Sequence, residues 1–226
     1  KFVETRQAMF AGGFKASGDS FSTEGPMFGR IQQLAALRKA SKALTHGTIE
    51  VLYDSDAGPG AFAFRRSYQS EQGLVLMNTA EEDVLFAQLA TGLPAGSVLE
   101  LLYKQGNVDV PKVGAGGLLD AVVPGRAVLV LRPTGKTETP TPPTATITVD
   151  SMIEGKTYTE DVTFTGTVSP KDSLVWLILD GLYNQAQVAK VAPDGTWSVT
   201  LGVSGFPTGT ARHSATFGVP GKVWSK

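Results

Sequence analysis

The sequence predicts a mainly β protein with two antiparallel β-sandwich domains, preceded by a loop and one α-helix. Three observations lead to this fold class. Apolar residues alternate with polar ones from residue 48 onward, turn residues interrupt the runs every ~8–12 residues, and a Thr/Pro-rich segment divides the runs into two groups. With 226 residues, the chain is long enough for two small domains that each bury a core.

The first element is a loop over residues 1–22, which show no sustained period and are rich in glycine. A helix follows, with Ser22 or Thr23 as the expected N-cap and Pro26 in the first turn. Gly47 is expected to end it. Its apolar residues fall near one face at helical spacing: Met27, Ile31, Leu34, Leu37 and Leu44.

Strands account for the rest of the chain. In residues 47–132 the predicted strands are 48–54, 60–68, 73–79, 83–90, 97–103, 107–110, 119–123 and 126–132. Residues 133–144 are rich in Thr and Pro and predict an extended, semi-rigid linker. In residues 145–226 the predicted strands are 145–150, 162–168, 173–180, 186–192, 196–202 and 211–219, a pattern typical of an immunoglobulin-like sandwich.

Composition excludes several classes of protein. The net charge of −1 and the pI near 6.2 argue against a nucleic-acid partner. No apolar run reaches the ~18–20 residues of a membrane span. The absence of cysteine excludes disulfides and thiolate metal sites. Lys1 is not an initiator Met and no signal-peptide pattern follows it, so we expect that processing removed the start or that a longer protein precedes it.

No catalytic or metal-binding motif survives inspection. Asp54-Ser-Asp56 begins like a calcium loop, but the position of the bidentate Glu is occupied by Arg65, so we expect only a turn. The glycines of residues 114–117 lack the following helix of a dinucleotide site and predict a tight loop. His46 and His213 are expected to be structural, because neither has a second ligand or nucleophile at useful spacing. We therefore predict no catalytic residue and no metal site.

Aromatic residues supply the remaining candidate site. Trp176 and Trp197 lie inside alternating strands and are expected in the core. Trp224 and Tyr183 fall in predicted loops, where an exposed ring could stack on a sugar. These two residues are the carbohydrate-binding candidates.

The helix and the strands after it also carry spaced residues that resemble a known family. The helix carries the pattern L-x-x-L-R-x-x-x-x-A-L-x-x-G, and an R-x-x-M-F run lies upstream of it. Downstream are a strand like V-x-A-F-x-R and a strand with Val75 and Asn78 that resembles a V-x-x-x-N-x-S element. The matching positions are Arg6, Met9, Phe10, Leu34, Leu37, Arg38, Ala43, Leu44, Gly47, Phe62, Ala63, Phe64, Arg66, Val75 and Asn78. Residues 1–132 thus resemble the end of the catalytic barrel and the following domain C of the α-amylase family of glycoside hydrolases. The later stretch DGTWSVTLG resembles bacterial immunoglobulin-like modules appended to secreted polysaccharide enzymes.

This resemblance implies that residues 1–46 complete a (β/α)₈ barrel in a parent protein and that residues 47–132 are domain C. The parent would be an extracellular, retaining α-glucan hydrolase or transglycosylase, whose three catalytic carboxylates precede this chain. The resemblance allows a calcium ion in that barrel and no cofactor in this chain. The implied partners are α-glucans, reached through the parent, and the barrel fragment itself.

A different class of function stays open at this stage. Two sandwiches without a barrel would suit a stand-alone carbohydrate-binding or cell-surface adhesion protein. That hypothesis predicts that residues 1–22 belong to the first sandwich and that exposed aromatic rings line a groove. Glycan binding by the chain alone would favour it.

Overall fold

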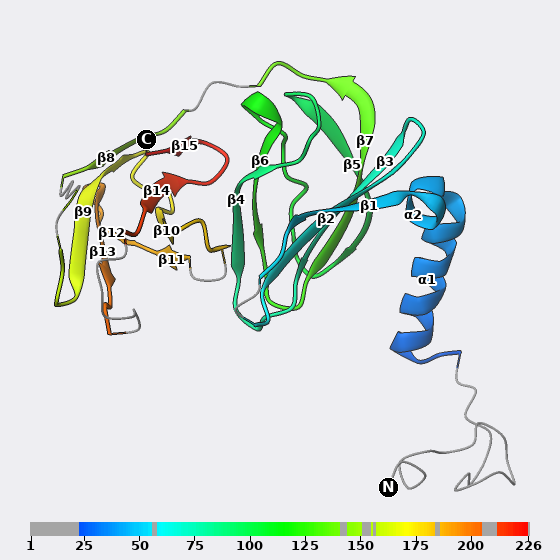
Figure 1. Cartoon of the computed structure of the whole chain (residues 1–226), viewed down its shortest axis with the longest axis horizontal. Helices are drawn as coiled ribbons and strands as arrows, with labels where there is room; N and C mark the ends of the chain where they lie inside the picture. Colours follow the sequence, from blue (N-terminus) through cyan, green and yellow to red (C-terminus); the bar gives the residue numbers. More distant parts are fainter. Residues whose placement is uncertain are drawn as a thin grey trace, which may run out of the picture.

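The computed structural model describes residues 23–55, 58–140, 144–150, 155, 157–183, 186–204 and 212–225. It is mainly β, with antiparallel sheets and one main helix, which confirms the predicted fold class. Figure 1 shows the strands in two groups, with the helices beside the first group. The upstream R-x-x-M-F run and Asp56 of the rejected calcium loop lie outside the described residues.

The predicted single helix is in fact two helices, α1 (Pro26–Ala40) and α2 (Lys42–His46). Ser41 separates them in an extended conformation and becomes the N-cap of α2, where its Oγ accepts a hydrogen bond from the Leu44 amide at 3.3 Å. The expected N-cap was also wrong: α1 begins at Pro26 after Gly25, which makes no side-chain cap. Gly47 ends α2, as predicted.

The first group of strands forms two facing sheets. A five-stranded antiparallel sheet has the order β1-β2-β3-β7-β5, and a two-stranded sheet pairs β4 with β6. The strands are β1 (Thr48–Tyr53), β2 (Ala61–Tyr68), β3 (Glu71–Asn78), β4 (Val84–Ala90), β5 (Ser97–Gln105), β6 (Leu118–Val123) and β7 (Val128–Thr137). Apolar residues of both sheets, such as Leu74, Phe86 and Leu129, fill the core between them.

Two predictions in this region need correction. Residues 107–110 form no strand: Val108 is buried in the core, while Gly106 turns the chain with φ of 96° and Pro111 has no N–H for a ladder. The last strand also continues beyond residue 132 to Thr137. Its partner β5 is nine residues long, and Ser97 at the start of β5 pairs with Thr137.

The second group of strands forms two four-stranded sheets, with the orders β12-β13-β9-β8 and β11-β10-β14-β15. Its strands are β8 (Thr146–Val149), β9 (Val162–Ser169), β10 (Trp176–Leu179), β11 (Gln187–Val188), β12 (Lys190–Val191), β13 (Thr196–Leu201), β14 (Ala215–Val219) and β15 (Val223–Trp224). Trp197 is buried in the core between the sheets, as predicted, and its ring fits over Gly166.

The predicted strand 186–192 divides into β11 and β12, which belong to different sheets. Ala189 lies between them, and its amide bonds the carbonyl of Val175 at 2.8 Å as the chain crosses from one sheet to the other. The short strand β15 was not predicted. No helix in the described ranges is both long and apolar enough to cross a membrane.

Candidate functional site

The apolar residues of α1 point into open space. Met27, Ile31 and Leu34, which we call the α1 face, have exposed fractions of 64%, 59% and 39%. No residue of α1 is buried, and Figure 1 shows the helix extending away from the sheets. An apolar stripe of this kind normally packs against another element. The α1 face is therefore left uncovered by the residues that the structure describes.

In contrast, α2 is firmly docked on the outer face of the five-stranded sheet. Leu44 is buried there with Val75 and Val130. Gly73 makes room for Leu44, because a Cβ at this position would lie 3.1 Å from Leu44 Cδ2. Glu71 accepts hydrogen bonds from the Ser41 hydroxyl and, at 3.2 Å, from the Lys42 amide. Thus α2 fixes the end of α1 to the first sandwich.

Tyr183 lies between the two sandwiches and is half-buried. Its ring stacks on Tyr53 with centroids 4.4 Å apart and meets the edge of Phe86 at 5.8 Å. Its hydroxyl donates to the Ala87 carbonyl at 2.6 Å. Burial raises the pKa of Tyr183 to about 12, and Tyr53 and Asp120 act in the same direction. The expected exposure of this ring is wrong, because the first sandwich covers it.

Trp224 also lies at this junction. It is half-buried in β15, not in a loop, and its ring packs over Gly218. Its Nε1–H donates to Asp120 Oδ2 at 2.9 Å, and the same oxygen accepts the Gly221 amide at 2.7 Å. The structure therefore brings Trp224 and Tyr183 to one interface. Their carbohydrate-binding role stays a prediction.

A bulge in β4 shapes the first sandwich for these contacts. The register with β6 shifts between Phe86 and Leu89, and Gln88 adopts a φ of 50°. The Gln88 amide donates to Asp120 Oδ1 at 2.5 Å. The backbone N–H of the bulged Gln88 thereby holds one oxygen of the Asp120 carboxylate, while the other oxygen accepts hydrogen bonds from the second sandwich. Sequence reasoning missed Asp120, although it is the only charged residue of the strand LLDAVV.

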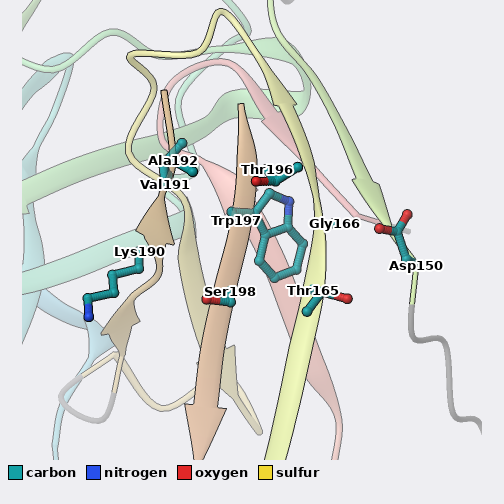
Figure 2. Close-up of a pocket in the computed structure, with 9 residues that line it drawn as sticks. All are labelled: Asp150, Thr165, Gly166, Lys190, Val191, Ala192, Thr196, Trp197 and Ser198. Carbon is teal, nitrogen blue, oxygen red and sulfur yellow. The ribbon is translucent and has the colours of Figure 1, made fainter. Parts of the chain in front are cut away.

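A shallow hollow of about 510 Å³ lies on the sheet of β12, β13, β9 and β8. Figure 2 shows Lys190 and Asp150 on opposite sides of it, with Thr165, Thr196 and Ser198 between. Trp197 contributes to the lining but is only 2% exposed, so its ring is not available for stacking on a ligand.

The two histidines that the structure places lie apart from one another, in different parts of the fold. Within the described ranges, no three His, Asp or Glu side chains converge as metal ligands would. His46 ends α2 and contacts the Tyr68 ring at 5.8 Å. His213 Nδ1 lies 2.7 Å from Asp180 Oδ2. Burial raises the pKa of Asp180, but hydrogen bonds from His213 and the Ser214 amide outweigh it and lower the pKa below its ordinary value.

The remaining motif, the glycine run of residues 114–117, is a tight turn as predicted. Gly116 and Gly117 have φ of 67° and 74°, and a Cβ on Gly117 would lie 2.2 Å from the carbonyl oxygen of Leu93. The following residues form β6 instead of a helix. The run therefore positions a loop of the first sandwich.

Comparison with known proteins relates the sequence to a curated α-amylase. No family model matches the sequence. A curated α-amylase from Streptomyces lividans is 29% identical over 204 residues, which are 89% of this chain and 20% of the amylase. The chain thus spans about one fifth of the length of this relative.

Similar solved structures include an α-amylase from Geobacillus thermoleovorans complexed with acarbose. It is 21% identical, with a TM-score of 0.44, and the match covers 53% of this chain and 26% of that one. An Anoxybacillus α-amylase is 24% identical, with a TM-score of 0.42 and coverage of 52% and 25%. Over most of its length, this chain is therefore similar in sequence to one part of an α-amylase.

Proposed function

We propose that these 226 residues are the non-catalytic C-terminal portion of an α-glucan-acting glycoside hydrolase or transglycosylase of the α-amylase family. The observation that carries this proposal is the match to only one fifth of an α-amylase, over 89% of this chain. Such a match leaves four fifths of the relative, including room for a whole catalytic barrel, without a counterpart here.

The exposed α1 face supports this function. In the proposed parent, residues 1–46 supply the last loop and helix of the barrel, and α1 covers the barrel sheet with Met27, Ile31 and Leu34. Residues 47–132, together with the rest of β7 up to Thr137, act as domain C. The remainder of the predicted linker 133–144 connects it to a second, immunoglobulin-like module over 145–226. Because α2 is docked through Leu44 and Gly73, the first sandwich holds α1 at a fixed place beside the barrel.

The chemistry belongs to the proposed barrel. Retaining hydrolysis of a glycosidic bond needs two carboxyl groups about 5–5.5 Å apart, one as nucleophile and one as acid and base. We place these groups, and any calcium ion of the parent, in the barrel. The described residues contain no cluster of acidic groups that could hold such an ion. We further propose an extracellular location, as in the secreted polysaccharide enzymes that carry similar modules.

Activity and binding assays on the purified chain test this proposal. We expect no release of reducing sugar from soluble starch or maltooligosaccharides, and measurable hydrolysis by homogeneous protein would refute it. Calorimetric titration with maltoheptaose measures glycan binding separately from hydrolysis. Binding by the chain alone would instead support the stand-alone carbohydrate-binding function.

The coding sequence upstream of Lys1 provides an independent test. We expect it to encode barrel strands carrying an Asp nucleophile, a Glu acid/base and a third Asp. An upstream sequence without these carboxylates would overturn the proposal.

A further inference from the structure

We propose that the second sandwich is a fixed part of one rigid unit with the first, and that Asp120 and Tyr183 set its orientation. The alternative is a module that moves freely on the Thr/Pro-rich segment. The proposal concerns residues 48–225 alone and holds whether or not a barrel precedes them. Figure 1 shows β4 and β6 on the side of the first sandwich that faces the second.

Two outward-facing side chains of the second sandwich are buried against the first. In β10, Leu177 points into the core of its own sandwich, whereas Trp176 and Ile178 belong to a separate cluster with Leu85 and Ala87 of β4. Trp176 and Ile178 are only 5% and 3% exposed. On a free module these two side chains would face water, which apolar surface disfavours. Their burial requires the first sandwich.

The Asp120 carboxylate accepts hydrogen bonds from both sandwiches. Its Oδ1 is fixed within the first sandwich by the Gln88 amide at 2.5 Å. Its Oδ2 receives both the Gly221 amide and Trp224 Nε1–H of the second sandwich. Hydrogen bonds to a charged acceptor are stronger than neutral ones and depend on angle. One carboxylate therefore defines where the β14–β15 turn can lie.

Tyr183 of the second sandwich fits into a socket formed by residues of the first sandwich. Tyr53 and Phe86 contact its ring, while the bulged Ala87 carbonyl accepts its hydroxyl. The Tyr183 amide in turn donates to the Tyr53 hydroxyl at 3.3 Å. Together with Asp120, this socket gives two separate points of attachment, which prevents the second sandwich from rotating about either one.

The connection between the sandwiches is also anchored at both ends. The Glu138 amide donates to the Gly96 carbonyl at 2.8 Å, so the first sandwich extends to this residue. Ala145 is 5% exposed in the core of the second sandwich. Only residues 139–144 lie between, and six residues span at most about 20 Å when fully extended. This short segment limits how far an undocked module could travel.

The test uses the absence of cysteine, which allows two spin labels to be placed without background. Lys136→Cys on β7 and Lys190→Cys on β12 are both exposed and lie in different sandwiches. Pulsed dipolar spectroscopy should give a single narrow distance distribution. A broad or multiple distribution in this otherwise unaltered chain would overturn the proposed rigidity.

Variants then test the two residues. Asp120→Ala combined with Tyr183→Ala should broaden the distribution and shift tryptophan emission to the red, because the three tryptophans all lie in the second sandwich and two of them at the junction. Asp109 is an exposed acid near Asp120, and Asp109→Ala should change neither the distance distribution nor the tryptophan emission. If the double variant keeps the narrow distance, Asp120 and Tyr183 do not set the orientation.

A second, more conservative double variant tests the same two residues in case the alanine substitutions prevent folding. Asp120→Asn with Tyr183→Phe keeps the shape of both side chains and removes the charge and one hydroxyl. Circular dichroism should show intact sheets, while the distance distribution widens. An unchanged distribution in this folded pair would also contradict the role of the two groups.

Discussion

Replacing Met27, Ile31 and Leu34 by glutamine should leave the unfolding free energy of this chain nearly unchanged. Glutamine has a helix propensity close to those of Met and Leu, so the substitution mainly tests whether the α1 face is covered. The exposed fractions of 64%, 59% and 39% show that the residues placed by the structure leave these side chains largely uncovered. We therefore expect a change within about 0.5 kcal/mol, as for other surface substitutions.

The same fractions give the energy that a covering neighbour would add. Complete burial of a Leu, Ile or Met side chain is worth about 1.5–3 kcal/mol. The area still exposed on the α1 face equals more than one and a half whole side chains, so covering it would contribute about 2.5–5 kcal/mol. The triple substitution should consequently be costly only where the barrel is present.

Urea unfolding followed by far-ultraviolet circular dichroism measures this difference. Leu44→Ala is the matched control, because Leu44 is also helical and apolar but is only 7% exposed. We expect this control to cost about 2–5 kcal/mol. If the triple variant loses as much as the control does, the α1 face is covered within this chain, and the inference of a missing neighbour fails.

Three further predictions concern individual positions. Gly166→Ala should destabilise the chain by about 1–3 kcal/mol, because the new Cβ would lie 1.9 Å from a backbone oxygen of β8. Gly114→Ala should be tolerated, since the nearest atom to its new Cβ would lie at 3.5 Å. Thermal unfolding of the two variants tests this difference. The hydrogen bond from Ser41 lowers the pKa of Glu71, so Glu71 stabilises the fold above the ordinary carboxyl pKa and loses this effect as the pH falls through its lowered value; the stability of Glu71→Gln should therefore depend less on acid pH. Tyr183, whose pKa is raised to about 12, should stabilise the fold fully below pH ~10 and progressively less up to about 12. Tyr183→Phe should remove a step near this pH from a spectrophotometric phenol titration.

Most strands could be predicted because alternation of apolar and polar residues reports directly on which face of a sheet is buried. The errors arise where one residue has an unusual task. Residues 107–110 alternate like a strand, yet they form a loop whose Val108 side chain is buried in the core. Ala189 lies inside an apparent strand, yet the chain changes sheets there. Such choices depend on partners distant in the sequence, which local periodicity does not contain.

The junction between the sandwiches was missed for a related reason. Residues 84–87 read VLFA and are all buried, which is the pattern of a strand covered on both faces. That continuous apolar run was the available signal that the outer face of β4 has a partner. The partner could not be identified from the sequence, because Tyr183 and Trp224 lie far downstream of these residues. Rings of this kind are common both in sugar sites and in interfaces, and only geometry distinguishes them.

The junction between the sandwiches and the α1 face differ in how far their apolar side chains are covered. At the junction, the fold covers Trp176 and Ile178 almost completely and satisfies Asp120 with three donors. The α1 face, in contrast, leaves three apolar side chains at helical spacing in water, and exposed apolar surface promotes association. The helix is also held in place by α2, so its exposure is not that of a frayed terminus. The economical physical explanation is a neighbour that covers α1, which is the place the proposed barrel would occupy.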